Sequence, residues 1–289
     1  DILRKEWGFD GLVVTDWGGS NDHVKGVMCQ SDLEMPAPGL DSARELVTAV
    51  NEGRLSMKDI DLCVDHVLDA VLDLKQKAEE KKSVFDEKAH HALARKAAAE
   101  SAVLLKNEDN ILPLKPGTRI ALIGDFAFVP RYQGTGSSMV NPFNVESMDQ
   151  LIDEYDLQVI GKAHGYTRNG EPDADLKKEA LEAAAGADVV LYCFGLDEIS
   201  ESEGKDREHM RLPQNQLWLL NELVKVNKNM VGILSAGSSI EMPWQYDLKA
   251  ILHSYLGGEA GAGAILDILT GKINPSGRLA ETYPLRYED

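Results

Sequence analysis

The sequence predicts an α/β protein in which a mostly parallel sheet carries helices on both faces. Two observations support this fold class. From Arg119 onward, short apolar segments alternate with longer segments of helical composition, and this alternation is typical of βα units. Near the N-terminus, the apolar residues 12–14 are followed closely by Asp16 and Trp17. A short apolar run that stops at polar residues indicates a buried strand of a parallel sheet.

Residues 1–75 are expected to combine short extended segments with helices. A strand at 11–14, a helix within 20–30, an extended segment at 32–35 and a helix at 42–52 follow one another. A longer helix begins after Ser56, whose spacing to Asp59 resembles a capping box. Apolar residues recur on this helix at three- and four-residue spacing, which predicts a buried face. They are Ile60, Val64, Val67, Leu68, Val71 and Leu74.

The charge-rich run 76–82 is the best candidate for a linker, and it equally suits the solvated end of the preceding helix. An alanine-rich helix is expected at 86–105. Helices are then predicted at 144–155, 175–185, 213–227 and 258–270, and strands at 119–124, 188–194, 230–235 and 250–255. Pro213 stands at the start of its helix, where proline is favoured.

Composition narrows the possible functions. The chain has 289 residues and a formal net charge of −18, which disfavours binding to nucleic acids or anionic membranes. It has no apolar run long enough for a membrane span, and the acidic surface suits a neutral substrate. We expect a cytoplasmic protein with reduced thiols, because its three cysteines are widely spaced and match no disulfide or metal pattern. They are Cys29, Cys63 and Cys193.

The histidines also give no metal pattern. His66 lies beside the apolar face of its helix and is expected to be packed and hydrogen-bonded. His90 and His91 are expected at the surface. The glycines of Gly134-Thr-Gly136 lack the third glycine of a dinucleotide-binding loop, so a nucleotide-binding α/β protein is disfavoured. We expect no cofactor and no metal.

Several motifs, in order along the chain, together resemble one enzyme family. They are Trp7-Gly-Phe-Asp-Gly-Leu-Val-Val-Thr-Asp16-Trp17, Asp32-Leu-Glu-Met-Pro36, residues 98–107 with 112–114, residues 134–142, Ser202-Glu203-Gly204-Lys-Asp206-Arg207, residues 255–261 and residues 274–279. The chain resembles glycoside hydrolase family 3, which contains β-glucosidases and β-N-acetylhexosaminidases. Nearly the whole chain takes part in the resemblance.

The resemblance implies the end of a (β/α)8 TIM-type barrel followed by a mostly parallel six-stranded α/β sandwich. The barrel part would cover residues 1–75, a linker 76–90 and the sandwich 91–289. The chain would enter the barrel near its seventh strand and so represent a fragment, weakly active or inactive alone. An incomplete barrel would expose apolar strands and favour association or a homo-oligomer.

The resemblance assigns two catalytic carboxyls. A retaining glycosidase needs a nucleophile and an acid/base about 5–5.5 Å apart. Asp16 matches the nucleophile, although its segment taken alone is more typical of a helix cap or a turn. Glu203 is the candidate acid/base, with Glu201 as the alternative, although the loop alone would read as a solvated acidic loop. Desolvation and the nearby charges of Glu201 and Asp206 are expected to raise the pKa of Glu203. Arg207 would lower this pKa unless it is paired with Asp206.

Two further residues are assigned to substrate binding. Trp17 would form an aromatic wall for the sugar or belong to the core, and Arg207 lies in the Glu203 motif. The predicted function is hydrolysis of terminal non-reducing β-D-glucosyl residues in a β-glucoside or oligosaccharide. The alternatives are a β-N-acetylhexosaminidase of the same family and a non-catalytic carbohydrate-binding or assembly module. Asp22 and His23 resemble the Asp–His acid/base pair of such a hexosaminidase, but they follow the nucleophile strand and do not lie where that pair belongs.

Overall fold

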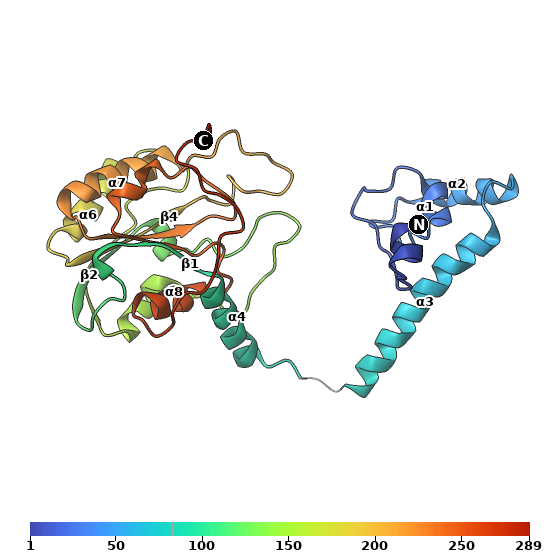
Figure 1. Cartoon of the computed structure of the whole chain (residues 1–289), viewed down its shortest axis with the longest axis horizontal. Helices are drawn as coiled ribbons and strands as arrows, with labels where there is room; N and C mark the ends of the chain where they lie inside the picture. The colour runs from blue at the N-terminus through green and yellow to red at the C-terminus, as the bar shows by residue number, and fades with distance from the viewer. Residues whose placement is uncertain (82–83) are drawn as a thin grey trace. The chain divides into compact units, whose positions relative to one another are not determined.

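The computed structural model describes residues 1–81 and 84–289. They form two compact units, which we call unit 1 (Asp1–Phe85) and unit 2 (Asp86–Asp289) (Figure 1). The expected linker at 76–90 includes residues 82 and 83, which lie outside the described residues. Its first residues belong to a long helix that continues to Glu80.

Unit 1 consists mainly of helices. A short helical turn at Ile2–Glu6 is followed by α1 (His23–Met28), α2 (Leu40–Asn51) and α3 (Met57–Glu80). The two segments expected as barrel strands lie side by side and join in a single parallel bridge between Val14 and Leu33. The described residues of unit 1 thus show one parallel pairing, and the end of a barrel stays a prediction.

A buried carboxylate joins these two segments. Asp32, whose side chain is fully buried, accepts a hydrogen bond from the backbone N–H of Val13 at 2.8 Å and pairs with Arg4 at 2.6 Å. The Nδ1 atom of His66 lies 2.8 Å from the other carboxylate oxygen. Burial alone would raise the pKa of Asp32, but the hydrogen bonds from His66 and Val13 lower it below its ordinary value. The prediction that His66 is packed and hydrogen-bonded is confirmed.

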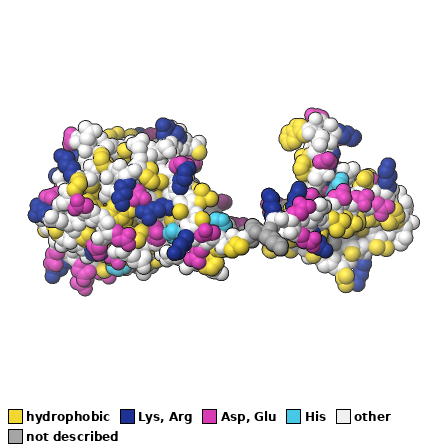
Figure 2. All heavy atoms as spheres, turned by 90° about the horizontal axis from the view of Figure 1, so that it is seen from below, with side chains coloured by type: hydrophobic (Ala, Val, Ile, Leu, Met, Phe, Trp, Pro, Cys, Tyr) yellow, Lys and Arg dark blue, Asp and Glu magenta, His cyan; other side chains and the backbone are white. Residues whose placement is uncertain are grey.

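The apolar segments of unit 1 are less buried than predicted. Ser56 caps α3 as expected by accepting a hydrogen bond from the N–H of Asp59 at 3.2 Å. However, Val64, Leu68 and Leu74 are about half exposed or more, and so is Val14 in the first segment. Hydrophobic side chains are visible at the surface of unit 1 in Figure 2. The predicted burial is wrong because the described elements of unit 1 cover only the early turns of α3, around Ile60 and Cys63.

Unit 2 is built on a six-stranded sheet. Its strands are β1 (Val103–Asn107), β2 (Thr118–Ile123), β3 (Leu157–Ala163), β4 (Val189–Gly195), β5 (Met230–Ser235) and β6 (Ala250–His253). The order across the sheet is β1-β6-β5-β4-β2-β3. All neighbouring pairs are parallel except β1 with β6. The predicted mostly parallel, six-stranded α/β unit is confirmed.

Helices cover both faces of the sheet (Figure 1). On one face lie α6 (Ala174–Ala184) and α7 (Gln214–Val226). On the other lie α4 (Glu87–Ser101), α5 (Met148–Leu151) and α8 (Gly261–Leu269). Successive residues of the central strands enter opposite cores: Leu191 packs with the α8 side, and Tyr192 with the α7 side. Both are fully buried, as expected for a sheet that is covered on both faces.

Two strands of unit 2 are absent from the prediction. The alanine-rich helix ends at Ser101, and the chain then becomes extended and forms β1, whereas a helix was expected to residue 105. The edge strand β3 alternates between partly buried and exposed residues, a weaker signal than a continuous apolar run. The helix expected at 144–155 is reduced to α5 and a short helical turn at Ile152–Glu154.

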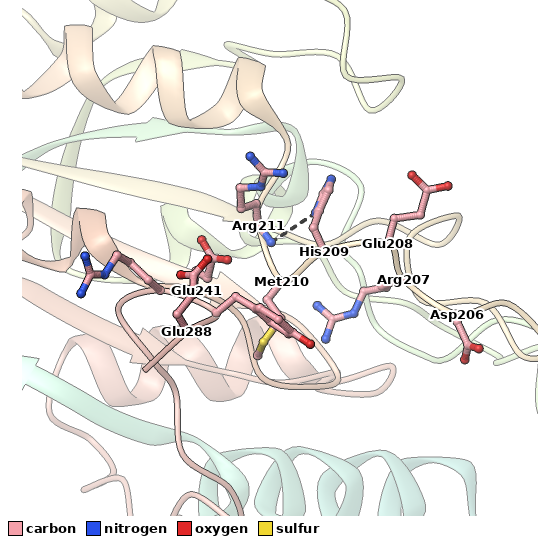
Figure 3. A pocket seen from close by; sticks show the side chains of 10 residues that line it. Asp206, Arg207, Glu208, His209, Met210, Arg211, Glu241 and Glu288 are labelled. Atoms are coloured by element: carbon pink, nitrogen blue, oxygen red, sulfur yellow. Dashed lines mark hydrogen bonds between the residues drawn. The ribbon is translucent and has the colours of Figure 1, made fainter.

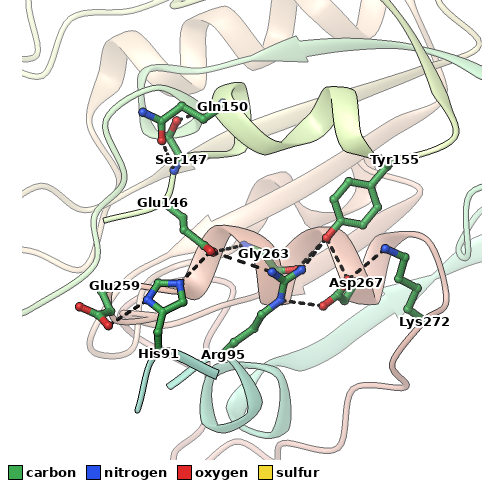
Figure 4. A network of polar contacts seen from close by, with 10 residues as sticks. All are labelled: His91, Arg95, Glu146, Ser147, Gln150, Tyr155, Glu259, Gly263, Asp267 and Lys272. Atoms are coloured by element: carbon green, nitrogen blue, oxygen red, sulfur yellow. Dashed lines mark hydrogen bonds and ion pairs between the residues drawn. The ribbon is translucent and has the colours of Figure 1, made fainter. Parts of the chain in front are cut away.

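A polar network joins α4 to α8 and to the loop before α5 (Figure 4). The two ring nitrogens of His91 lie 2.8 Å from Glu146 and 2.9 Å from Glu259. Arg95, one turn later on α4, pairs with Asp267 on α8 at 2.9 Å. The His91 side chain is 21% exposed, so this residue is partly buried in the network and not a simple surface residue as expected.

Candidate active site

Asp16 lies in unit 1, directly after the parallel bridge. Its side chain is exposed, and its Oδ1 accepts a hydrogen bond from the backbone N–H of Trp17 at 2.7 Å. No other hydrogen bond to this carboxylate occurs among the described residues. Trp17 is 71% exposed, so its indole is not part of the core of unit 1. Gly18 takes a positive φ of 75°, which favours glycine at this turn.

The neighbouring Asp22 and His23 are engaged in other contacts. Asp22 caps α1 by accepting a hydrogen bond from the N–H of Lys25 at 2.9 Å. His23 lies between two carboxylates, with its ring nitrogens 2.9 Å from Glu45 and 3.1 Å from Glu34. These hydrogen bonds, foremost that to Glu45, raise the pKa of His23. An Asp–His pair of the kind considered for a β-N-acetylhexosaminidase is therefore not formed by these two residues.

Glu203 lies in unit 2, in the loop that follows β4. A parallel bridge between Thr135 and Ser202 brings this loop against the glycine-rich segment 134–138. The N–H of Glu203 donates to the carbonyl of Thr135 at 2.9 Å, and the Glu203 carboxylate accepts from the N–H of Ser137 at 2.5 Å. Gly136 makes this approach possible, since a Cβ there would lie 2.4 Å from the Glu203 Cβ.

The surroundings of Glu203 shift its pKa in the direction opposite to the prediction. The hydrogen bond from Ser137 stabilises the ionised carboxylate and lowers the pKa of Glu203 below its ordinary value. The expected increase of this pKa is therefore wrong for the structure described. The reason is geometric, because the dominant partner is Ser137, which lies in a loop 66 residues earlier in the chain and contributes its side chain and its backbone N–H.

Glu201 and Glu203 have different surroundings although only one residue separates them. Both Glu201 oxygens accept the N–H of Gly237, at 3.0 and 2.8 Å, and the Ser238 hydroxyl donates to Oε1 at 2.7 Å. The Glu201 side chain is 11% exposed, whereas Glu203 is an exposed residue. A carboxylate that is largely buried and hydrogen-bonded to a turn stabilises the conformation of the loop. Glu203 is thus the better acid/base candidate.

Arg207 is held by the backbone and forms no pair with Asp206. Its Nη2 donates to the carbonyl of Ser239 at 2.8 Å. Arg207 lines an open groove of about 730 Å³ that also includes His209, Arg211, Glu241, Tyr287 and Glu288. Figure 3 shows the Arg207 guanidinium turned towards Met210, while the carboxylates of Asp206 and Glu208 point away from it. A polar groove beside the Glu203 loop offers donors and acceptors for a polyhydroxylated ligand.

Other site types find no support among residues 1–81 and 84–289. No cluster of three or more His, Cys, Asp or Glu side chains there is arranged to hold a metal ion. No helix in the same residues combines the length and hydropathy needed to cross a membrane. Cys29 is exposed, and Cys63 and Cys193 are buried, all three as free thiols.

The sequence-based interpretation did not anticipate the roles of Ser137, Thr135 and Arg131. Ser137 and Thr135 act through backbone groups, which carry no side-chain signature. The pairing of two glycines around Thr135 was the available signal, because glycines in a loop permit close backbone approach. Arg131 is buried beside Glu201, and no periodicity in the sequence indicates such burial.

Comparisons with known proteins agree with one another. A family model described as the C-terminal domain of glycosyl hydrolase family 3 matches residues 102–289. Thermostable beta-glucosidase B of Acetivibrio thermocellus is 43% identical over 99% of this chain and 38% of its own length. An exo-alpha-(1->6)-L-arabinopyranosidase of Bifidobacterium breve is 40% identical over 100% of this chain and 39% of its own length. The chain thus spans about two fifths of these curated relatives.

Solved structures give the same result. The crystal structure of a GH3 beta-glucosidase from Bifidobacterium adolescentis matches with a TM-score of 0.91 and 41% identity, over 99% of this chain and 42% of that one. Beta-glucosidase 3B from Thermotoga neapolitana, in complex with alpha-D-glucose, matches with a TM-score of 0.86 and 26% identity. This second match covers 99% of this chain and 45% of that one.

Proposed function

The chain belongs to glycosyl hydrolase family 3, and on this premise we propose that it carries the two catalytic carboxyls of a retaining β-glucosidase. The substrate would be a β-glucoside or oligosaccharide with a terminal non-reducing β-D-glucosyl residue. Asp16 is the nucleophile and Glu203 the acid/base. Trp17 and Arg207 contact the substrate, Trp17 through its exposed ring and Arg207 through the groove that it lines.

The reaction proceeds in two displacements. In the first, an oxygen of Asp16 forms a bond to the anomeric carbon while the glycosidic bond breaks, and Glu203 gives its proton to the leaving oxygen. In the second, Glu203 takes a proton from water. The water oxygen then bonds to the anomeric carbon as the bond to Asp16 breaks. Each carboxyl returns to its starting state.

One observation carries the assignment of the acid/base: within one loop, Glu203 is exposed and Glu201 is bound to the Gly237 turn. An acid/base must move a proton to a substrate oxygen and must therefore reach solvent or substrate. For the nucleophile, the exposed Asp16 at the end of a parallel segment meets the same requirement. Its Oδ1 accepts a hydrogen bond from the N–H of Trp17, which orients the carboxylate.

Trapping the covalent intermediate tests the nucleophile. The chain is incubated with 2-deoxy-2-fluoro-β-D-glucosyl fluoride, and the adduct is located by peptide mass mapping. Attachment to Asp16, its loss in Asp16→Asn and its retention in the matched control Asp10→Asn support the proposal. Attachment elsewhere, or turnover of glucosides without any adduct on Asp16, contradicts it.

The dependence on the leaving group tests the acid/base. Glu203→Gln should strongly reduce kcat/KM for phenyl β-glucoside, whose leaving group needs protonation. It should affect 2,4-dinitrophenyl β-glucoside much less, because that leaving group departs as an anion. Glu179→Gln, which changes an exposed residue of α6, is the control. Equal losses on both substrates in Glu203→Gln would exclude the proposed role.

A second substrate is favoured by the 40% identity to an exo-alpha-(1->6)-L-arabinopyranosidase. An α-L-arabinopyranosyl unit is a pentose ring and lacks the hydroxymethyl group of glucose. The same two carboxyls could act on either glycoside. The ratio of kcat/KM for 4-nitrophenyl β-D-glucoside to that for 4-nitrophenyl α-L-arabinopyranoside decides between the two.

A further inference from the structure

Arg131 is a buried cation in the loop after β2. The residue is 2% exposed, and its side chain is fully buried. Its Nε, Nη1 and Nη2 atoms have no hydrogen-bond partner among the described residues. The adjacent residue, Tyr132, accepts a hydrogen bond from the N–H of Gly258 at 2.9 Å, so the backbone at this point is fixed. A buried guanidinium needs a compensating charge.

That charge is supplied by Glu201. The Arg131 Nη2 lies 3.8 Å from the Glu201 Oε2, the one ion pair of Arg131 within the described residues. This distance is too long for a hydrogen bond. The attraction between charges falls only with the first power of distance, however, and is weakly screened away from water. Glu201 is therefore held by the turn at Gly237 and Ser238 and by the charge of Arg131.

The loops that contain Arg131 and Glu201 also meet around Glu203. The Thr135–Ser202 bridge and the Ser137–Glu203 hydrogen bond join the same two segments. The segment 131–138 thus contacts the segment 201–203 at three successive points, and Arg131–Glu201 is the buried one. Glu203 itself is bonded to the partly buried Thr135 and the exposed Ser137, so Arg131–Glu201 is the buried contact between the two segments.

We propose that Arg131 is a positioning residue: its buried charge, through Glu201, fixes the loop that presents Glu203. The proposal rests on the proposed function only where it concerns catalysis. Arg131 touches neither substrate nor reacting atoms. Without that charge, the Glu201 carboxylate loses its attraction to the segment 131–138 and keeps the hydrogen bonds from Gly237 and Ser238. The hydrogen bonds between the Gly237 turn and the loop that contains Glu201 and Glu203 then break more often.

Amide hydrogen exchange tests the positioning role without requiring turnover. The amides of Glu203, Ser137 and Gly237 each donate one of the bonds described. In Arg131→Met, their exchange should become about tenfold faster through local opening. Arg131→Lys keeps the charge and should restore much of the protection. Arg95→Met, which removes the pair with Asp267 on the α4–α8 side, is the matched control for loss of an ion pair in unit 2.

Two outcomes of the exchange experiment overturn the proposal. One is unchanged protection of the three amides in Arg131→Met. The other is an equal increase in Arg95→Met, which would reflect general destabilisation of unit 2. If Arg131→Met does not fold, the comparison of Glu201→Gln with Glu208→Gln replaces it. Faster exchange at the three amides in Glu201→Gln alone supports the proposal, and equal exchange in both variants contradicts it.

A kinetic readout separates this proposal from the proposed function. A displacement of the acid/base near 1 Å costs about a hundredfold in rate. Arg131→Met should therefore reduce kcat/KM for phenyl β-glucoside by about that factor, with a much smaller loss for 2,4-dinitrophenyl β-glucoside. If Glu203→Gln lacks this leaving-group dependence, the proposed function fails, while the exchange result still decides whether Arg131 fixes the loop.

Discussion

The histidine between two carboxylates in unit 2 makes folding stability depend on pH in a specific way. Both ring nitrogens of His91 face carboxylate oxygens, those of Glu146 and Glu259. Only the protonated ring can donate to both, because a neutral imidazole has one donor and one acceptor. The hydrogen bond to Glu146, followed by that to Glu259, raises the pKa of His91, while burial opposes them. Replacing His91 with Gln removes this dependence of folding stability on the protonation of residue 91.

The sign follows from the raised pKa. A folded-state pKa above the unfolded value near 6.5 means that the stabilisation is complete below about pH 6.5 and is lost as pH rises through the folded pKa. The loss corresponds to one charge-assisted hydrogen bond, about 1.5–3 kcal/mol. His91 is 21% exposed, so we take about 2 kcal/mol of unfolding free energy. For a unit of this size, the equivalent change in Tm is about 4–8 °C.

The assay is urea unfolding of the original chain and His91→Gln at pH 5.5 and pH 8.5. Replacing Trp7 and Trp17 with Phe leaves Trp218 and Trp244 as tryptophan reporters, and both lie in unit 2. The destabilisation caused by His91→Gln should be about 2 kcal/mol larger at pH 5.5 than at pH 8.5.

A control separates His91 from the other titrating groups. His209 is exposed in the groove loop, and His209→Gln is the matched control for replacement of a histidine. An effect of His91→Gln that is independent of pH would refute the reasoning. It would mean that the two carboxylates do not both require a donor from the ring.

Three further predictions concern other parts of the chain. Tyr155→Phe should lower the unfolding free energy of unit 2 by about 1–3 kcal/mol in urea unfolding, because its hydroxyl bonds Arg95 at 2.7 Å and Asp267 at 2.9 Å. Gly136→Ala should detach Glu203 from Ser137 and raise the pKa of Glu203 towards its ordinary value, as measured by NMR titration, since the added Cβ would lie 2.5 Å from Oε2. Iodoacetamide at pH 8 should modify the exposed Cys29 first, as followed by intact mass, because Cys63 is buried with a pKa raised to about 11 and Cys193 is buried.

The central part of the unit 2 sheet could be predicted from local sequence because its strands are continuous apolar runs. The strand at 230–235 coincides with β5, and the strand at 188–194 lies within one residue of β4. The edge strands β1 and β3 were missed for a physical reason. Each has a partner on one side only, so its residues need not be uniformly apolar.

Burial and electrostatics could not be predicted because they depend on residues distant in sequence. The spacing of Val64, Leu68 and Leu74 shows which face of α3 is apolar, but burial requires an element to cover that face. Likewise, the carboxylates near Glu203 in the sequence suggested a raised pKa, while hydrogen bonding from Ser137 in the segment 134–138 lowers it. The family resemblance identified the residues of interest, and geometry was needed to separate Glu203 from Glu201.

The lowered pKa of Glu203 constrains the proposed mechanism. A general acid must hold its proton near the working pH, and the hydrogen bonding from Ser137 favours the ionised form. Under the proposal, this hydrogen bonding therefore disfavours the first displacement, in which Glu203 gives up a proton. It favours the second displacement, in which the ionised carboxylate takes a proton from water.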